Sequence, residues 1–182
     1  MKRKPVREIF AESFRELAEN KSVDKITVRE IADNCGYSSA TFYRQFRDKY
    51  DLIAWDYSRR LEAIILQIGV KECSWRQSLI DAANYFQEQK RYLANLFLHT
   101  SGLDSFICNM REIHFSCLRE IVQRVSQTTR LDAKTEMYIR IYVLGTVHLT
   151  CEWILGNYSV SPKELAEVYE NSLPEPLRQY FC

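Results

Sequence analysis

Hydrophobic positions along this chain recur at intervals of three and four residues, which favours helices over strands. Near the start, Val6, Phe10, Phe14 and Leu17 follow this spacing and predict a helix over about residues 5–20. No stretch alternates with period two for long enough to predict a strand. The chain also has only five glycines and four prolines, so it has few residues that interrupt helices. The pattern therefore predicts an all-α protein of about nine helices.

Capping signals divide the chain further. The run Thr27-Val28-Arg29-Glu30 is a capping box, in which a hydroxyl and a carboxylate satisfy the first free N–H groups of a helix. Gly36 ends that helix, and Ser38 can cap a very short helix that reaches about residue 45. Asp48 can open a longer one to residue 69. The remaining helices are predicted at about 74–89, 91–99, 103–127, 132–155 and 161–173, the last ended by Pro174 and Pro176.

Two short helices around a glycine turn make a helix-turn-helix pattern, whose second helix enters the major groove of DNA. At about 100° per residue, Phe42 and Phe46 form an inward stripe, whereas Ala40 and Arg44 lie on the opposite side. An arginine there can bind a guanine, and the neighbouring side chains can reach phosphates. The candidate DNA-binding residues are Thr27, Arg29, Ser38, Ser39, Ala40, Thr41, Tyr43, Arg44 and Lys49.

Residues 6–60 resemble the N-terminal DNA-binding domain of TetR-family transcriptional regulators. The shared features are a Thr-Val-x-x-Ile-Ala opening from Thr27, a glycine turn, and Tyr-x-x-Phe followed by x-x-Lys-x-x-Leu from Tyr43 to Leu52. Ala40 and Phe42 depart from the residues common in the family, which leaves the base preference open. The resemblance implies a DNA-binding domain at residues 1–50 with a connecting helix over 48–69, and a regulatory and dimerisation domain at 70–182.

Charge and composition limit the classes of function that we expect of this chain. The chain carries a net charge of +1. Residues 1–50 hold 11 Lys and Arg against 8 Asp and Glu, and residues 51–182 hold 14 against 16. Scattered histidines and six cysteines without C-x-x-C spacing predict no metal site. The sequence has no phosphate-binding loop, paired catalytic carboxylates or nucleophile–base signature, so we expect neither an enzyme nor a cofactor. It also has no segment long enough to span a membrane, so we expect a soluble cytoplasmic protein.

The second half is rich in aromatic residues, and apolar side chains with a few polar groups are typical of ligand pockets. The candidate effector-pocket residues are Phe86, Tyr92, Phe97, Phe115, Tyr142 and Trp153. Trp153, the start at Ser161 and the Leu173-Pro174 pair also resemble a subgroup related to regulators of dihydroxyacetone kinase operons. In that subgroup a partner protein can act as the co-regulator. A small-molecule effector and a protein co-regulator are therefore both open.

The helix over 132–155 is apolar nearly all round, which indicates burial on more than one side. We therefore predict a homodimer, in which this helix and the helix over 161–173 form a four-helix bundle with a second copy and serve a palindromic operator. The candidate interface residues are Ile141, Gly145, His148, Leu165, Val168 and Tyr169. The predicted function is a transcriptional repressor. A helical interaction module that binds no DNA is the alternative from another class.

Overall fold

The computed structural model describes residues 4–65, 74–102 and 105–181, and these residues form ten α-helices and one 3₁₀-helix, with no strand. The predicted domain boundary near residue 70 and the predicted helix start at Leu103 lie outside the described residues. The elements are α1 (Val6–Ala18), η1 (Val23–Lys25), α2 (Val28–Asn34), α3 (Ser39–Tyr43), α4 (Lys49–Ile65), α5 (Trp75–Glu88), α6 (Lys90–His99), α7 (Phe106–Val125), α8 (Ala133–Ile154), α9 (Pro162–Asn171) and α10 (Glu175–Arg178).

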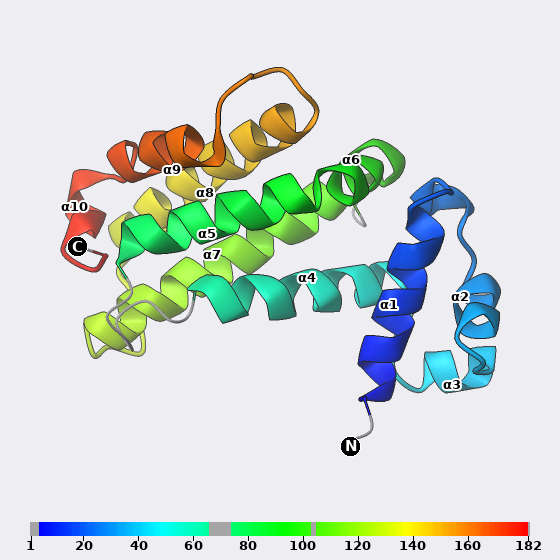
Figure 1. Cartoon of the computed structure of the whole chain (residues 1–182). Coiled ribbons are helices and arrows are strands. Elements are labelled where there is room, and N and C mark those ends of the chain that lie inside the picture. The colour runs from blue at the N-terminus through cyan, green and yellow to red at the C-terminus, as the bar shows by residue number, and fades with distance from the viewer. Residues whose placement is uncertain (1–3, 66–73, 103–104, 182) are drawn as a thin grey trace.

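Helices α1, α2 and α3 form a small unit at one end of the molecule, which we call the helix-turn-helix unit (Figure 1). Its core is made by Phe10, Phe14, Ile31 and Phe42, which are completely buried. The buried hydroxyl of Ser13 donates a hydrogen bond of 2.7 Å to the carbonyl oxygen of Ile31 and so fixes α1 against α2. Burial of four large side chains gives this short segment the apolar area that it needs to fold.

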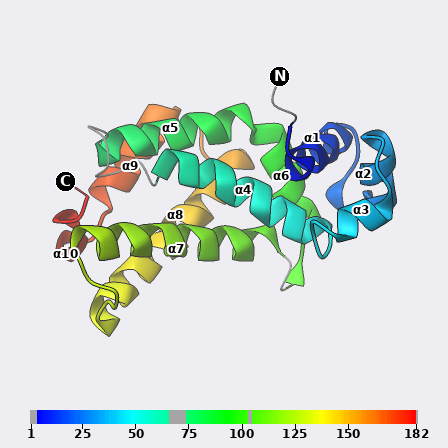
Figure 2. The same ribbon diagram turned by 90° about the horizontal axis from the view of Figure 1, so that it is seen from below.

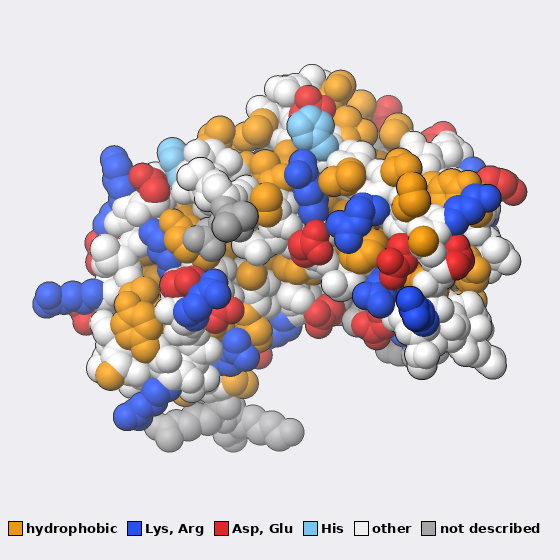
Figure 3. All heavy atoms as spheres, turned by 180° about the vertical axis from the view of Figure 1, so that it is seen from behind, with side chains coloured by type: hydrophobic (Ala, Val, Ile, Leu, Met, Phe, Trp, Pro, Cys, Tyr) orange, Lys and Arg blue, Asp and Glu red, His pale blue; other side chains and the backbone are white. Residues whose placement is uncertain are grey.

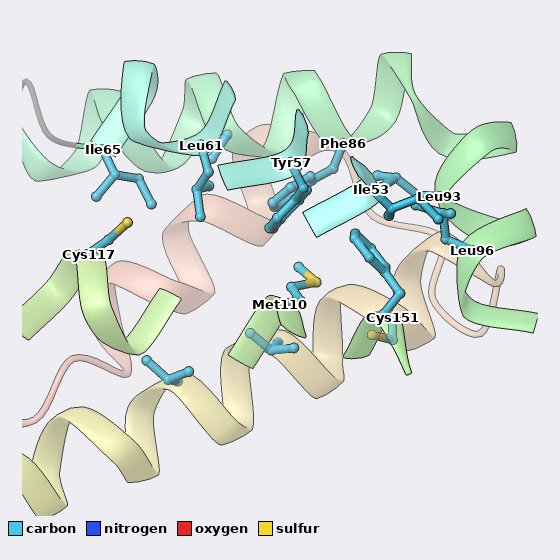
Figure 4. Packing of buried hydrophobic residues seen from close by; sticks show 14 of the residues in the cluster. Ile53, Tyr57, Leu61, Ile65, Phe86, Leu93, Leu96, Met110, Cys117 and Cys151 are labelled. Atoms are coloured by element: carbon cyan, nitrogen blue, oxygen red, sulfur yellow. The ribbon is translucent and has the colours of Figure 1, made fainter. Parts of the chain in front are cut away.

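Helix α4 leaves this unit and runs beside the other half of the molecule (Figures 1 and 2). Asp48 caps it by accepting hydrogen bonds from the N–H groups of Tyr50 (2.9 Å) and Asp51 (2.8 Å). The inward face of α4 carries a row of buried apolar side chains that ends at Ile65 (Figure 4). In the same view, the side chains of Met110 and Cys117 on α7 point toward this row. α4 therefore belongs to both halves of the structure.

Helices α5 to α9 form the second half, which we call the regulatory bundle. α5 packs along α9, and α7 packs along α8 (Figures 1 and 2). The side chains of Phe106, Met110, Ile121 and Val147 in its core are at most 1% exposed. Within the described residues, none of the helices is both long enough and apolar enough to cross a lipid bilayer.

Two short elements were not predicted. Pro174 and Pro176 were expected only to end the helix over 161–173, yet Pro174 is the N-cap of α10 and Pro176 lies in its first turn. A proline is tolerated there because the first N–H groups of a helix have no intrahelical partner. α10 is held by Leu177, which is completely buried. η1 has three residues, too few to produce a periodic pattern.

Candidate DNA-binding surface and regulatory cavity

The turn between α2 and α3 depends on Gly36, whose φ of +75° lies in the left-handed region. A β-carbon at this position would meet no atom within 4 Å, so glycine is favoured by its backbone conformation rather than by lack of space. Beyond the turn, the Ser38 hydroxyl accepts a hydrogen bond from the N–H of Thr41 and starts α3. The turn and the cap together fix the direction in which α3 leaves the unit.

One face of α3 is anchored in the core, as the sequence predicted. The ring of Phe42 lies 5.2 Å from that of Phe10 and 5.6 Å from that of Phe46, measured between centroids. The opposite face is open: Ala40 and Arg44 are exposed, and Tyr43 is 59% exposed. Arg44 makes no hydrogen bond or ion pair with any described residue, so its guanidinium group is available to a ligand of the opposite charge.

Several other candidate residues already have partners. The hydroxyls of Ser38 and Thr41 lie 3.0 Å apart, within hydrogen-bonding distance. Arg29 is paired with Asp33 at 3.5 Å on the solvent side of α2. Ser39, which is partly buried, lies in the first turn of α3. Ser38, Ser39 and Thr41 lie at the start of α3, whereas Arg29 lies on α2, and the polar groups that already have partners would have to exchange them to reach DNA.

Thr27 is the most constrained of the candidates. Its peptide N–H and its hydroxyl both donate to Oε2 of Glu30 at 2.9 Å, and the hydroxyl also accepts from the Glu30 N–H. The hydrogen bond from Lys21, together with those from Thr27, lowers the pKa of Glu30 to about 2. The capping box is therefore confirmed, and it places a carboxylate against the hydroxyl of this candidate DNA-binding residue.

Lys49, a candidate DNA-binding residue, makes its hydrogen bonds within the protein. Its ammonium group donates to the carbonyl oxygens of Val23 (2.8 Å), Asp24 (2.9 Å) and Ile26 (2.8 Å). A lysine ammonium has three N–H donors, and here each has an acceptor within the protein. Lys49 therefore fastens the first turn of α4 to the η1 segment instead of facing a ligand.

A cavity of about 40 Å³ lies in the regulatory bundle between α5, α7, α8 and α9. Phe86 and Tyr142, two of the candidate effector-pocket residues, line it, and so does Ile65 from the end of α4. A cavity of this size can hold a few water molecules, but it is smaller than the apolar cavity of about 150 Å³ that accepts a benzene ring. Its full lining is Ile65, Trp75, Ser78, Leu79, Ala82, Ala83, Phe86, His114, Leu118, Tyr142, Thr146, Thr150 and Tyr169.

The other four predicted pocket residues lie elsewhere. Tyr92 packs on Phe14 of α1, with ring centroids 6.2 Å apart. Phe97 packs on Phe106 at 5.4 Å. Their aromatic surface is used to join helices instead of lining the cavity.

Phe115 and Trp153 also lie outside the lining of this cavity. The guanidinium of Arg140 lies 4.2 Å from the centre of the Phe115 ring. The indole N–H of Trp153 donates to the carbonyl oxygen of Val160 at 2.9 Å and holds the chain that follows α8.

The polar groups around the cavity are uncharged. The hydroxyl of Tyr57 lies 2.6 Å from Nε2 of His114, and burial lowers the pKa of His114 to about 4. The imidazole is therefore neutral at pH 7. Tyr142 donates to the carbonyl oxygen of Tyr169, and the hydroxyls of Tyr169 and Thr150 lie 2.7 Å apart. Sequence reasoning missed the threonines, although two threonines four residues apart on an apolar helix were a usable signal.

The outer face of α8 and α9 carries an exposed apolar groove (Figure 3 shows the molecule from behind). Ile141 is 64% exposed and Val168 is 48% exposed, and both line this groove with Gly145 and His148. Leu165 and Tyr169 differ from the prediction because they are buried within the chain. The apolar stripe of α9 is present, but these two side chains face the protein's own bundle, and Tyr169 also borders the groove.

Comparison with known proteins identifies the family. The model of the N-terminal part of the tetR family of bacterial regulatory proteins matches residues 13–54, which include α2 and α3. A second model, of a C-terminal region of transcriptional regulators of this family, matches residues 74–174, more than half of the chain. The chain belongs to the TetR family of transcriptional regulators. No curated protein matches its sequence.

Solved structures of TetR-family and related regulators share the fold across nearly the whole chain. The dihydroxyacetone kinase operon activator DhaS has a TM-score of 0.65 and 16% identity, with 97% of this chain and 98% of that chain covered. FadR of Thermus thermophilus, a repressor solved with lauroyl-CoA, has a TM-score of 0.63 and 18% identity, with 92% of each chain covered. A TetR regulator from Rhodococcus sp. RHA1 has a TM-score of 0.64 and 15% identity, covering 92% and 97%.

Proposed function

We propose that this TetR-family regulator binds a palindromic DNA operator as a homodimer, represses transcription there, and is released when a small uncharged molecule enters the regulatory bundle. In this proposal residues 1–50 contact DNA and residues 70–182 carry the cavity and the dimer interface. The observation that carries the DNA-binding part is the division of α3 into a buried face at Phe42 and an open face at Ala40, Tyr43 and Arg44.

The open face of α3 fits direct base recognition. Small residues at Ser39 and Ala40 allow the start of the helix to approach base edges, and Arg44 can form two hydrogen bonds to a guanine. Thr41 and Tyr43 lie on the same short helix, beside Ala40 and Arg44, and their side chains can reach phosphates. Ser38, Thr27 and Arg29 are proposed as peripheral contacts, since each must first exchange an intramolecular partner. We leave Lys49 out of the proposed contact set because its ammonium group makes three hydrogen bonds within the protein.

A second copy of the chain is the proposed occupant of the α8 and α9 groove. One recognition helix offers few base contacts, and two copies give a useful preference over non-specific DNA. Met137, Ile141, Leu144 and Val168 are all at least 44% exposed, although apolar side chains of this size are usually buried. Gly145 lies among them and allows two α8 helices to approach closely. A twofold pairing would bury all of these side chains at once.

The cavity supports an uncharged effector. Its described lining has hydroxyl groups and a neutral imidazole but no carboxylate, lysine or arginine. A carboxylate or phosphate placed there would lose its hydration without gaining a counter-charge. FadR of Thermus thermophilus was solved with lauroyl-CoA, whose head group is highly charged. We propose that this chain takes a smaller, neutral ligand instead, and that the cavity enlarges as the ligand enters.

A protein co-regulator is the second candidate. The cavity of about 40 Å³ is small for an organic effector, which favours control from the surface of the bundle. The neighbour DhaS is described as an operon activator, so the same fold also serves activation. The two candidates predict different behaviour of the isolated protein, because only the first predicts a response to small molecules alone.

The test begins with selection of duplexes from a random pool by the purified protein, followed by affinity measurements at several salt concentrations. We expect one palindromic sequence to be enriched, with log affinity falling linearly with log salt concentration. Uncharged ring compounds such as indole are then titrated against the complex, each beside its carboxylate analogue. Release by the neutral compound alone supports the proposal. Release by the carboxylate alone contradicts the proposed ligand class, and failure to enrich any duplex contradicts DNA binding.

A further inference from the structure

One face of α6 touches the helix-turn-helix unit through three side chains one turn apart. Tyr92 packs on Phe14 of α1, as described above. Asn95, three residues later, lies against the end of α1 and the start of η1. His99, one turn further on, pairs with Asp24 at 3.6 Å. We call this contact the α6 joint: Phe14 and residues 18–26 on one side, and Tyr92, Asn95 and His99 on the other.

Asn95 is the centre of the joint. Its amide nitrogen donates to the carbonyl oxygens of Ala18 (2.8 Å) and Lys21 (2.9 Å), and its amide oxygen accepts from the N–H of Val23 (3.1 Å). Both N–H donors of the amide are thus used on backbone groups more than 70 residues away in sequence. Carbonyls at the end of a helix have no partner within that helix, so a side chain from α6 here completes the end of α1.

The same backbone segment is held from α4. Val23 is completely buried, its N–H binds Asn95 and its carbonyl oxygen binds Lys49. Lys49 also binds the carbonyl oxygens of Asp24 and Ile26. The η1 segment is therefore clamped between a neutral side chain of α6 and a charged one of α4. With both clamps in place, it has little freedom to change its orientation.

We infer that Asn95 is a positioning residue for DNA recognition: through its three hydrogen bonds it fixes the helix-turn-helix unit at one orientation on the regulatory bundle. This inference rests on the proposed operator binding by a dimer. A dimer reads two half-sites at a set separation only if each reading unit is held rigidly on the common interface. Asn95 does not touch DNA, and it acts through residues 18–26. A preorganised orientation raises affinity because less freedom is lost on binding.

The first measurement uses the free protein. Asn95→Ala removes all three hydrogen bonds, whereas Asn95→Asp keeps the acceptor for the Val23 N–H and loses both donors. We expect amide hydrogen exchange across residues 19–26 to speed up at least tenfold in Asn95→Ala, with the helices of the regulatory bundle unchanged. In Asn95→Asp the Val23 N–H should stay better protected than in Asn95→Ala. Asn84→Ala, at an exposed position of α5, is the matched control and should exchange like the wild type.

The second measurement separates positioning from a loss of folded protein. A duplex selected by the wild type is compared with the same duplex carrying one extra base pair between its half-sites, which turns one half-site by about 35°. We expect the wild type to lose at least tenfold in affinity on this insertion, and Asn95→Ala to lose less than threefold. A smaller folded fraction would weaken binding to both duplexes by the same factor and leave the insertion penalty unchanged.

The outcomes are distinguishable. Wild-type exchange across residues 19–26 in Asn95→Ala would overturn the inference, and so would an unchanged insertion penalty. If the wild type selects no duplex, the proposed function fails, but hydrogen exchange in the free protein still decides whether Asn95 holds the joint. If Asn95→Ala does not fold, Asn95→Asp supplies both measurements, since it retains one of the three hydrogen bonds.

Discussion

One buried carboxylate on α4 contributes to the attachment of this helix to α1. Asp56 on α4 is 3% exposed and accepts hydrogen bonds from Arg15 on α1, including one of 2.9 Å from Nε to Oδ2. Arg59 and Arg60 approach Oδ1 of the same carboxylate at 3.6 and 3.5 Å. Asp56→Asn removes the negative charge that all three arginines approach, although Arg59 keeps a second carboxylate partner in Glu8 of α1 at 2.6 Å. The variant is nearly the same size, so its effect reports the charge and its hydrogen bonds.

The magnitude follows from burial. Removing one partner of a buried ion pair costs roughly 3–5 kcal/mol, because the remaining charge stays desolvated. The side chains of Arg15, Arg59 and Arg60 keep 19%, 39% and 33% of their exposure, so water screens part of the repulsion. We therefore expect a loss at the lower end, about 3 kcal/mol in the free energy of unfolding. For a chain of this length that corresponds to a fall of roughly 6–12 °C in melting temperature.

Urea unfolding followed by circular dichroism, at one fixed protein concentration, measures this loss as a shift of the midpoint with unchanged slope. Asp33→Asn is the matched control, because Asp33 pairs with Arg29 at 3.5 Å on the surface, where both side chains are more than 60% exposed. The control should lose less than about 0.5 kcal/mol. In combination with Arg15→Met, Asp56→Asn should cost less than the sum of the two single changes. The reasoning would be refuted if Asp56→Asn and Asp33→Asn were equally stable.

Three further predictions concern the open face of α3, the groove on α8 and α9, and the cavity. Arg44→Ala should weaken operator binding by roughly 1–3 kcal/mol and relax the base preference. Duplex selection repeated with the variant measures that preference, and an unchanged preference would contradict the prediction. Ile141→Glu should yield a monomer in sedimentation at micromolar concentration, whereas Glu167→Gln, on the exposed side of α9, should stay dimeric. His114 has a pKa of about 4 in the folded protein, below its value of about 6.5 in an unfolded chain. Because the unfolded chain takes up the proton first, stability should fall as pH decreases from about 6.5 to 4, by roughly 3 kcal/mol in total, and His114→Gln should reduce this dependence.

Local signals in the sequence were sufficient for most of the helices. Thr27 with Glu30 and Ser161 with Glu164 form capping boxes in the structure, and in each the glutamate side chain reaches back to the N-cap N–H. Phe42 lies inward and Arg44 outward because a helix of known start fixes every later direction on its surface. These features depend on neighbours within four residues, which is the range that a sequence pattern describes.

Contacts between distant segments could not be predicted in the same way. Lys49 was a candidate DNA-binding residue from its place in the sequence motif, and only the fold shows that the carbonyls of residues 23, 24 and 26 take its three donors. Tyr92 and Trp153 are aromatic like Phe86, but they serve helix packing and a loop contact. For Leu165 the apolar stripe of α9 was correct, while the choice between the protein's own bundle and a second copy depended on where α5 lies.

Helix α4 connects the features described above. Lys49 in its first turn holds η1, Asp56 near its middle holds α1, and Ile65 at its end lines the cavity. The helix has 17 residues and so extends about 25 Å as a single hydrogen-bonded rod.

A ligand that enlarges the cavity must move some of its lining. A displacement of Ile65 would turn the whole of α4, because the interior of this helix contains no proline or glycine at which it could bend. Asn95 holds the same η1 segment from α6, so rotation of α4 alone would strain the hydrogen bonds at Val23. In the proposed regulation, an enlarged cavity would therefore act on the open face of α3 by moving α4 and the α6 joint together, or by breaking one of the two clamps.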